Sequence, residues 1–251
     1  MSAPLLETHA LCKRFGGLLA TDSVSLSVRR GECHALIGPN GAGKTTLIGQ
    51  LSGSLRPDAG VVRFDGRDVT CLGAHQRAML GFARSFQITS ILNDFSVLDN
   101  VGVALQAVSG SSFAFWRPVA AETALSTEAT AILDKVGLAG LASRRARDLS
   151  HGEHRQLEIA LALATRPQLM LLDEPMAGMG PDESERMVRL ITELKGRYTI
   201  LLVEHDMDAV FRLADRISVL VAGRVIATGT VDEIRANDAV KCAYLGEEEV
   251  D

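Results

Sequence analysis

The stretch GPNGAGKT, at residues 38–45, decides the fold of this chain. It follows an apolar run, CHALI, and precedes a run of helical character. In that context the spacing predicts a phosphate-binding loop, because its glycines let backbone N–H groups turn inward and Lys44 adds a cation for the β- and γ-phosphates. A glycine-rich turn of purely structural purpose would need neither Lys44 nor Thr45. The residues expected to bind the nucleotide here are Gly38, Pro39, Asn40, Gly41, Ala42, Gly43, Lys44, Thr45 and Thr46.

Two acidic residues, Asp173 and Glu174, follow another apolar run at residues 169–172. A buried strand that ends in carboxylates lies where open α/β sheets bind their ligands. We expect Asp173 to hold Mg²⁺, directly or through water, together with the hydroxyl of Thr45, and Glu174 to orient and deprotonate the attacking water. The alternative, a cap on a following helix, is disfavoured because Pro175 comes next and no helical pattern begins there.

Short apolar runs alternate with helical patterns along the chain, as in a parallel sheet covered by helices. Further strands are predicted at residues 200–203 and in a hairpin of residues 217–221 and 224–227. Alternation at Val24, Leu26 and Val28 predicts a strand with one exposed face. A surface helix begins at Pro181, and another begins just after His205. We therefore predict a single domain, residues 1–251, with a mostly helical insertion at residues 88–149.

Composition excludes several other classes of protein. A net charge of −5 and a pI of about 5.7 give no general reason to expect nucleic-acid binding. The 4 cysteines are far apart and form no metal-binding pattern, so reduced thiols are expected. The N-terminus lacks the pattern of a signal peptide. Polar residues interrupt the longest uncharged stretch, residues 100–116, whereas a bilayer span needs about 20 mostly apolar residues. We expect no membrane span.

A third motif, LSHGE at residues 149–153, resembles the LSGGQ signature of ABC ATPases. This resemblance implies that Gln87 is the glutamine that reaches Mg²⁺ and water, and that His205 contacts the γ-phosphate. It also implies that Phe15 stacks on adenine, although a core position is the alternative for a lone phenylalanine. Ser150 and Gly152 would bind the nucleotide held by an opposite subunit, since Ser150 precedes a helical run and supplies a hydroxyl at a helix N-terminus.

Three positions depart from the commonest pattern of the family. Glu153 replaces the signature glutamine, and His151 replaces its first glycine. Gly180 stands where the loop that crosses the dimer interface usually carries Asp or Asn. Extra negative charge beside a phosphate would weaken closure of the dimer unless the side chain of Glu153 points away from it.

Within the family, the chain is most similar to ATP-binding subunits of branched-chain amino acid importers. Urea or amide importers and lipopolysaccharide-export ATPases are the alternatives. The segments that carry the similarity are RFGGLLA at residues 14–20, RSFQ at 84–87, HGEHRQLEIA at 151–160, AGM at 177–179 and AYLGE at 243–247.

The resemblance also implies the architecture and the assembly. The fold would be the P-loop ABC-ATPase fold, with a mixed sheet core, an N-terminal antiparallel β subdomain and the inserted helical subdomain. The ligands would be ATP and Mg²⁺. The expected partners are a second ATPase subunit in a homo- or heterodimer, two transmembrane permease subunits and, indirectly, a solute-binding protein. The chain would lie at the cytoplasmic face of the plasma membrane.

Overall fold

The computed structural model describes residues 3–84, 91–108 and 119–245, and its larger sheet is mixed. Only β9 and β10 pair antiparallel in it, as a hairpin. The central strands are buried on both faces, which accounts for their unbroken apolar sequences. In spatial order the strands are β10 (Arg224–Gly229), β9 (Arg216–Val221), β3 (Cys33–Ile37), β8 (Thr199–Val203), β7 (Leu169–Asp173) and β6 (Phe82–Arg84). The strands and the hairpin predicted at these places are confirmed.

A second, antiparallel sheet is built from the N-terminal part of the chain. It has the order β2 (Leu18–Arg29), β1 (Pro4–Phe15), β4 (Ala59–Phe64) and β5 (Arg67–Asp68). Val24, Leu26 and Val28 are buried, while the serines between them are exposed. The predicted one-sided strand is therefore confirmed, and its apolar face packs in a hydrophobic cluster that also contains Leu47 and Ile48 of α1.

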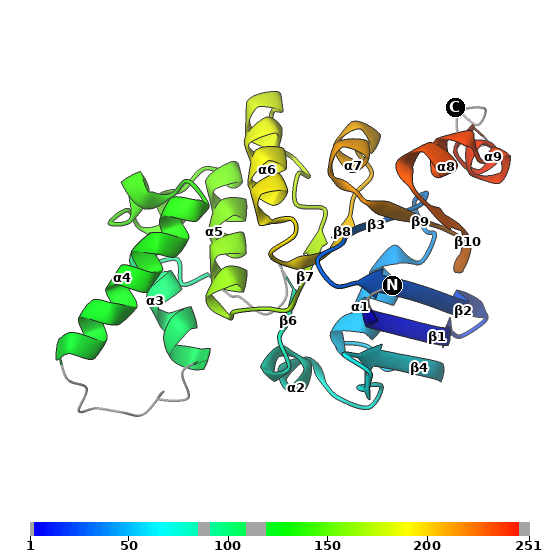
Figure 1. The fold of residues 1–251 in the computed structure, drawn as a ribbon, viewed down its shortest axis with the longest axis horizontal. Coiled ribbons are helices and arrows are strands. Elements are labelled where there is room, and N and C mark those ends of the chain that lie inside the picture. Colours follow the sequence, from blue (N-terminus) through cyan, green and yellow to red (C-terminus); the bar gives the residue numbers. More distant parts are fainter. Residues whose placement is uncertain (1–2, 85–90, 109–118, 246–251) are drawn as a thin grey trace.

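Helices surround the larger sheet, and Figure 1 shows α3, α4 and α5 at one end of the molecule and the antiparallel sheet at the other. Both predicted surface helices are confirmed: one begins at Pro181 and the other, capped by Asp206, at Met207. The helices are α1 (Lys44–Ser52), α2 (Ala74–Met79), α3 (Val97–Val108), α4 (Val119–Lys135), α5 (His151–Ala164), α6 (Pro181–Leu194), α7 (Met207–Leu213), α8 (Val231–Ala236) and α9 (Asp238–Leu245).

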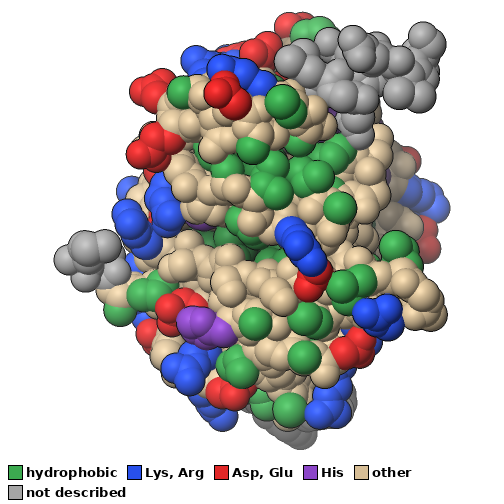
Figure 2. Space-filling view, turned by 90° about the vertical axis from the view of Figure 1, so that its right-hand side faces the viewer, with side chains coloured by type: hydrophobic (Ala, Val, Ile, Leu, Met, Phe, Trp, Pro, Cys, Tyr) green, Lys and Arg blue, Asp and Glu red, His purple; other side chains and the backbone are tan. Residues whose placement is uncertain are grey.

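The predicted insertion contains α3 and α4 in its described part, and its limits at residues 88 and 149 stay a prediction. Its apolar residues share one core with the rest of the chain, since Val97 and Leu133 lie in the same cluster as Leu172 of β7. No helix among the described residues is long and apolar enough to cross a membrane. On the face drawn in Figure 2, Lys, Arg, Asp and Glu side chains lie mostly around the outline, and hydrophobic side chains gather toward the middle.

The parallel strands β3, β7 and β8 place the predicted site. Their carboxyl ends lie at one edge of the sheet, because β8 pairs in parallel with both β3 and β7. The glycine-rich loop leaves β3, the pair Asp173 and Glu174 ends β7, and His205 follows β8. The fold thus brings residues that are 31 to 167 positions apart in the chain to one edge of the sheet.

Candidate active site

The loop at residues 38–45 is a tight cradle in which two glycines have a steric role. Gly38 and Gly43 have φ angles of 156° and 101°, which L side chains rarely adopt. A Cβ at Gly38 would lie 2.0 Å from the carbonyl oxygen of Leu220, and one at Gly43 would lie 2.2 Å from that of Ala20. The Lys44 ammonium donates hydrogen bonds to the carbonyl oxygens of Gly38 and Pro39. These two hydrogen bonds hold the ammonium group within the loop.

A cavity of about 470 Å³ opens beside this loop. Its size suits a small-molecule ligand. Phe15 forms part of its wall and is 49% exposed as a residue, so this phenylalanine is not part of the core. The ammonium of Lys13 lies 5.7 Å from the centre of that ring. The other lining residues are Leu18, Leu19, Ala20, Asn40, Gly41, Ala42, Gly43, Lys44, Thr45, Thr46, Glu174, Ala222 and Gly223.

Glu174 lines this cavity and also lies near His205. Its φ angle is 50°, an unusual backbone conformation for a non-glycine residue that is typical of functional sites. Its N–H donates to the Val203 carbonyl oxygen at 2.8 Å, which ties it to β8. Glu174 Oε1 lies 3.8 Å from His205 Nδ1, and their side chains are 45% and 64% exposed. The structure thus brings the predicted base and the predicted histidine together at an accessible edge.

Asp173 lies one residue earlier and has a different environment. Its Oδ2 accepts a hydrogen bond from Arg84 Nη2 at 3.1 Å, and its side chain is 21% exposed. Asp173 is not part of the cavity wall, whereas Glu174 and Thr45 are. A magnesium ion bound with the nucleotide would be held by the Thr45 hydroxyl and, directly or through water, by the Asp173 carboxylate. The donor set fits such an ion, since hydroxyl, carboxylate and phosphate oxygens are what Mg²⁺ prefers.

A buried carboxylate, Glu204, connects two loops of this edge and was not predicted from the sequence. Glu204 is 1% exposed, and burial raises the pKa of its carboxyl. Its two oxygens accept hydrogen bonds from the backbone N–H groups of Met176 at 2.9 Å and His205 at 3.1 Å. The only signal in the sequence was an acidic residue at the end of an apolar strand. Its role as an acceptor for the neighbouring loop depends on the fold.

The signature segment, residues 149–153, lies apart from this cavity. Ser150 caps α5, and the cap is reciprocal: Ser150 Oγ accepts from the N–H of Glu153 at 3.3 Å, and Ser150 N–H donates to Glu153 Oε2 at 2.7 Å. Ser150 and Gly152 line a second cavity, of about 330 Å³, which shares no residue with the first. The chain therefore does not bring its own signature segment to its own glycine-rich loop.

Two unusual signature positions make contacts within the chain. His151 Nε2 donates to the Ala177 carbonyl oxygen at 3.0 Å, which links the start of α5 to the loop before α6. The carboxylate of Glu153 turns back onto the N-cap of its own helix. Gly180 precedes α6 in an extended conformation and supplies no side-chain cap. Gln87 and its predicted contacts lie outside the described residues.

A glycine-rich loop that joins a central parallel strand to a helix, with two carboxylates at the end of a second strand, defines a P-loop nucleotide-binding protein. The comparisons with known proteins narrow this class. The family model described as ABC transporter matches residues 21–177, which is more than half of the chain. The chain belongs to the ABC transporter family, as one of its ATP-binding ATPase subunits.

Full-length relatives and solved structures agree with this assignment. The chain is 41% identical over 254 residues to the high-affinity branched-chain amino acid transport ATP-binding protein LivG of Salmonella typhimurium, covering 98% of this chain and 100% of that protein. It is 39% identical to BraF of Pseudomonas aeruginosa with the same coverage. The ADP conformation of MJ1267, an ATP-binding cassette of an ABC transporter, superposes with a TM-score of 0.83 at 30% identity, covering 98% of this chain and 100% of that chain. The predicted fold class is confirmed.

Proposed function

We propose that this chain hydrolyses ATP to power an importer of branched-chain amino acids. The observation that carries the proposal is the 41% identity, over the whole length of both proteins, to a relative named for branched-chain amino acid transport. A model of the branched-chain amino acid ATP-binding cassette transporters also matches residues 224–250, outside the residues 21–177 that the general ABC transporter model matches.

The site supports specific roles for the residues around the first cavity. Lys44 and the loop amides bind the phosphates, and Phe15, half exposed in the cavity wall, stacks on the adenine. Thr45 and Asp173 hold Mg²⁺, with Gln87 as the further predicted ligand. Glu174 orients and deprotonates the attacking water, and His205, 3.8 Å from Glu174, binds the γ-phosphate.

The two separate cavities support a dimer as the active form. Ser150 and Gly152 point into a cavity that the chain's own glycine-rich loop does not reach. The Ser150 hydroxyl and the backbone N–H of Gly152 lie at the N-terminus of α5, where the helix dipole favours an anion. We therefore propose that they bind the γ-phosphate held by a second ATP-binding subunit, identical or related, and that hydrolysis requires both chains.

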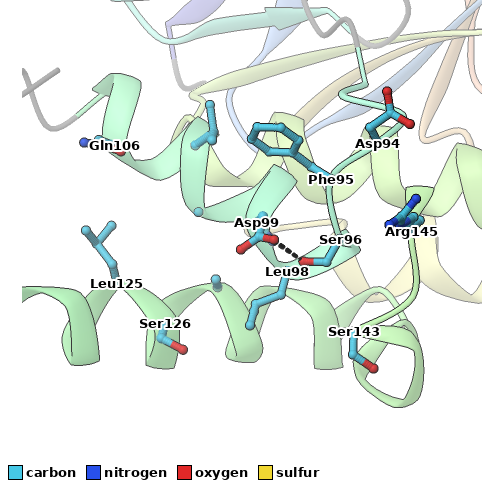
Figure 3. Close-up of a pocket in the computed structure, with 13 residues that line it drawn as sticks. Asp94, Phe95, Ser96, Leu98, Asp99, Gln106, Leu125, Ser126, Ser143 and Arg145 are labelled. Carbon is cyan, nitrogen blue, oxygen red and sulfur yellow. Dashed lines mark hydrogen bonds between the residues drawn. The ribbon is translucent and has the colours of Figure 1, made fainter. Parts of the chain in front are cut away.

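A third cavity, of about 630 Å³ between α3 and α4, supports the docking of permease subunits. Phe95 and Val103 line it and are 49% and 44% exposed, which is unusual for large apolar side chains. Figure 3 shows Leu98 and Leu125 on the two helices and the hydrogen bond from Ser96 to Asp99 at the edge. An apolar hollow with a polar rim fits a helical segment of a membrane subunit. In this arrangement the chain lies at the cytoplasmic face of the membrane, and a solute-binding protein acts from the other side.

Glu174→Gln tests the proposal in the purified protein and in cells. The variant should bind ATP as the parent does. Its rate of hydrolysis should be lower by a factor of roughly 100 or more, because the general base is lost while the phosphate loop is intact. Cells that carry this variant in place of the parent chain should lose high-affinity uptake of labelled leucine and keep uptake of labelled urea. Nucleotide binding, phosphate release and both uptakes are measured side by side.

Lys44→Ala is the matched variant, since it should weaken ATP binding itself. Unchanged hydrolysis in Glu174→Gln would remove the assigned role of the base. Loss of urea uptake with normal leucine uptake would instead refute the proposed solute and leave the ATPase assignment standing.

A further inference from the structure

Glu183, in the first turn of α6, lies against the signature segment of its own chain. Its Oε1 is 3.4 Å from Ser150 Oγ, which donates to it. A Cβ atom added to Gly152 would lie 2.7 Å from the same oxygen. The carboxylate therefore covers the two residues that are proposed to meet the γ-phosphate of a second chain, and all three line the same cavity.

The Ser150 hydroxyl can donate to only one acceptor at a time. A serine hydroxyl has one hydrogen to donate. Ser150 Oγ already accepts from the N–H of Glu153 at 3.3 Å, and its hydrogen is directed to Glu183. Phosphate oxygens are acceptors, so a γ-phosphate would need that same hydrogen. Glu183 and the phosphate thus compete for one donor.

The negative charge of Glu183 also opposes an incoming phosphate. The N-terminus of α5 already has the Glu153 carboxylate 2.7 Å from the backbone nitrogen of Ser150. Glu183 places a second carboxylate at this helix end, where the helix dipole stabilises anions. Two cations lie nearby: Arg186 also lines the cavity, and Arg144 Nη1 lies 3.9 Å from Glu153 Oε2. An arriving phosphate therefore meets negative charge at the helix end that should bind it.

We propose that Glu183 is a gate on the signature segment. In the separate chain it holds the Ser150 hydroxyl, and on closure of the dimer it releases that hydroxyl to the γ-phosphate of the second chain. The proposal rests on the proposed function, in which the signature segment binds the nucleotide of a second subunit. Because the two acceptors compete for one hydroxyl, ATP-driven closure is weaker than it would be without Glu183.

Glu183→Gln tests the gate in the full chain carrying Glu174→Gln, in which bound ATP is not consumed. Dimer formation is followed by sedimentation velocity across an ATP titration. The neutral side chain should lower the ATP concentration at half-dimerisation about tenfold, because an amide oxygen accepts the Ser150 hydroxyl more weakly than a carboxylate does. Glu183→Leu, which removes the acceptor altogether, should give an effect at least as large. Glu193→Gln makes the same charge change in the last turn of the same helix, and should stay within about twofold of the parent.

A double-mutant cycle with Ser150→Ala identifies the route of the effect. When the hydroxyl is absent, Glu183→Gln should shift the titration at least about threefold less than when it is present. If Glu183→Gln and Glu183→Leu leave dimerisation unchanged or weaken it, Glu183 merely positions Ser150 and the gate is refuted. If the chain that carries only Glu174→Gln forms no dimer with ATP, the proposed contact between two chains is refuted, whatever the role of Glu183. The two failures are thus distinguishable.

Discussion

Glu158, on α5 behind the signature segment, shows how burial changes the chemistry of one residue. Burial raises the pKa of its carboxyl from 4.5 to about 6, and the neighbouring Arg155 and His151 only partly oppose the shift. The folded chain therefore binds this proton more tightly than the unfolded chain. This contribution to stability is fully present below pH 4.5 and is lost as the pH rises through about 6.

Glu158→Gln should consequently stabilise the chain at pH 7.5 and have a smaller effect at pH 5. A shift of this size corresponds to about 2 kcal/mol, and the neutral amide avoids that cost while it can still accept from Arg155, now 3.1 Å away. Urea unfolding at both pH values measures the difference. The exposed Glu193→Gln serves as control, and an equal gain for Glu158→Gln at both pH values would contradict the assigned shift.

The residues proposed to bind phosphate and to act as the base were predictable because their chemistry requires a fixed spacing in the sequence. Gly38, Lys44 and Glu174 lie where that spacing placed them, around or beside one cavity. The residues that support them were not predictable. Glu204 and Glu183 meet partners 28 and 33 positions away, and those partners are chosen by the packing of loops and helices.

At the scale of elements, Arg77 of α2 holds the end of the helix that follows the phosphate loop. It is 1% exposed, and burial lowers the pKa of its guanidinium to about 10. Its Nη1 donates to the carbonyl oxygens of Gln50 and Leu51, in the last turn of α1. The same side chain also donates to the carbonyl oxygens of Leu72 and Thr70. One side chain thus satisfies helix-end acceptors that would otherwise be buried without a donor.

Arg77→Met should destabilise the chain by about 3 kcal/mol or more, because several buried carbonyl oxygens lose a charged donor at once. Arg77→Lys should recover only part of this loss, since an ammonium does not reproduce the planar fork of the guanidinium. Urea unfolding gives both values. The exposed Arg67→Met should change stability by less than about 0.5 kcal/mol; a similarly small effect of Arg77→Met would refute the capping role.

Elements were easier to predict than their contacts. The strands β3, β7 and β8 are apolar throughout because both faces are buried, and such runs stand out in the sequence. β6 has only three residues and was not predicted, although it completes the edge of the sheet. Short edge strands have too little sequence to show a period, so only pairing with β7 defines it.

For the whole molecule, the apolar cavity between α3 and α4 should be the surface that joins ATP hydrolysis to the membrane. Phe95→Asp should prevent co-purification with the permease subunits, because a charge would replace an apolar side chain whose burial contributes about 1.5–3 kcal/mol. ATP binding should remain, since Phe95 does not line the phosphate cavity. Affinity purification and nucleotide binding measure the two effects.

Ile226→Asp on β10 is the matched control. Ile226 is also a large apolar side chain at the surface, 39% exposed, in a different part of the fold. It should leave co-purification intact. Normal assembly of Phe95→Asp would exclude this cavity as the docking surface.

The buried Glu204 carboxylate also limits how this edge of the molecule can move. It accepts hydrogen bonds from backbone N–H groups in the loop after β7 and in the loop that carries His205. If only one of these loops opened, the buried carboxylate would lose part of its hydrogen bonds in a site with little access to water, which is an intermediate of high free energy. The two loops should therefore open in a single step, with one shared rate. If His205 binds the γ-phosphate as proposed, a movement of its loop would be passed at once to the loop after β7, because both loops are bound to the same carboxylate.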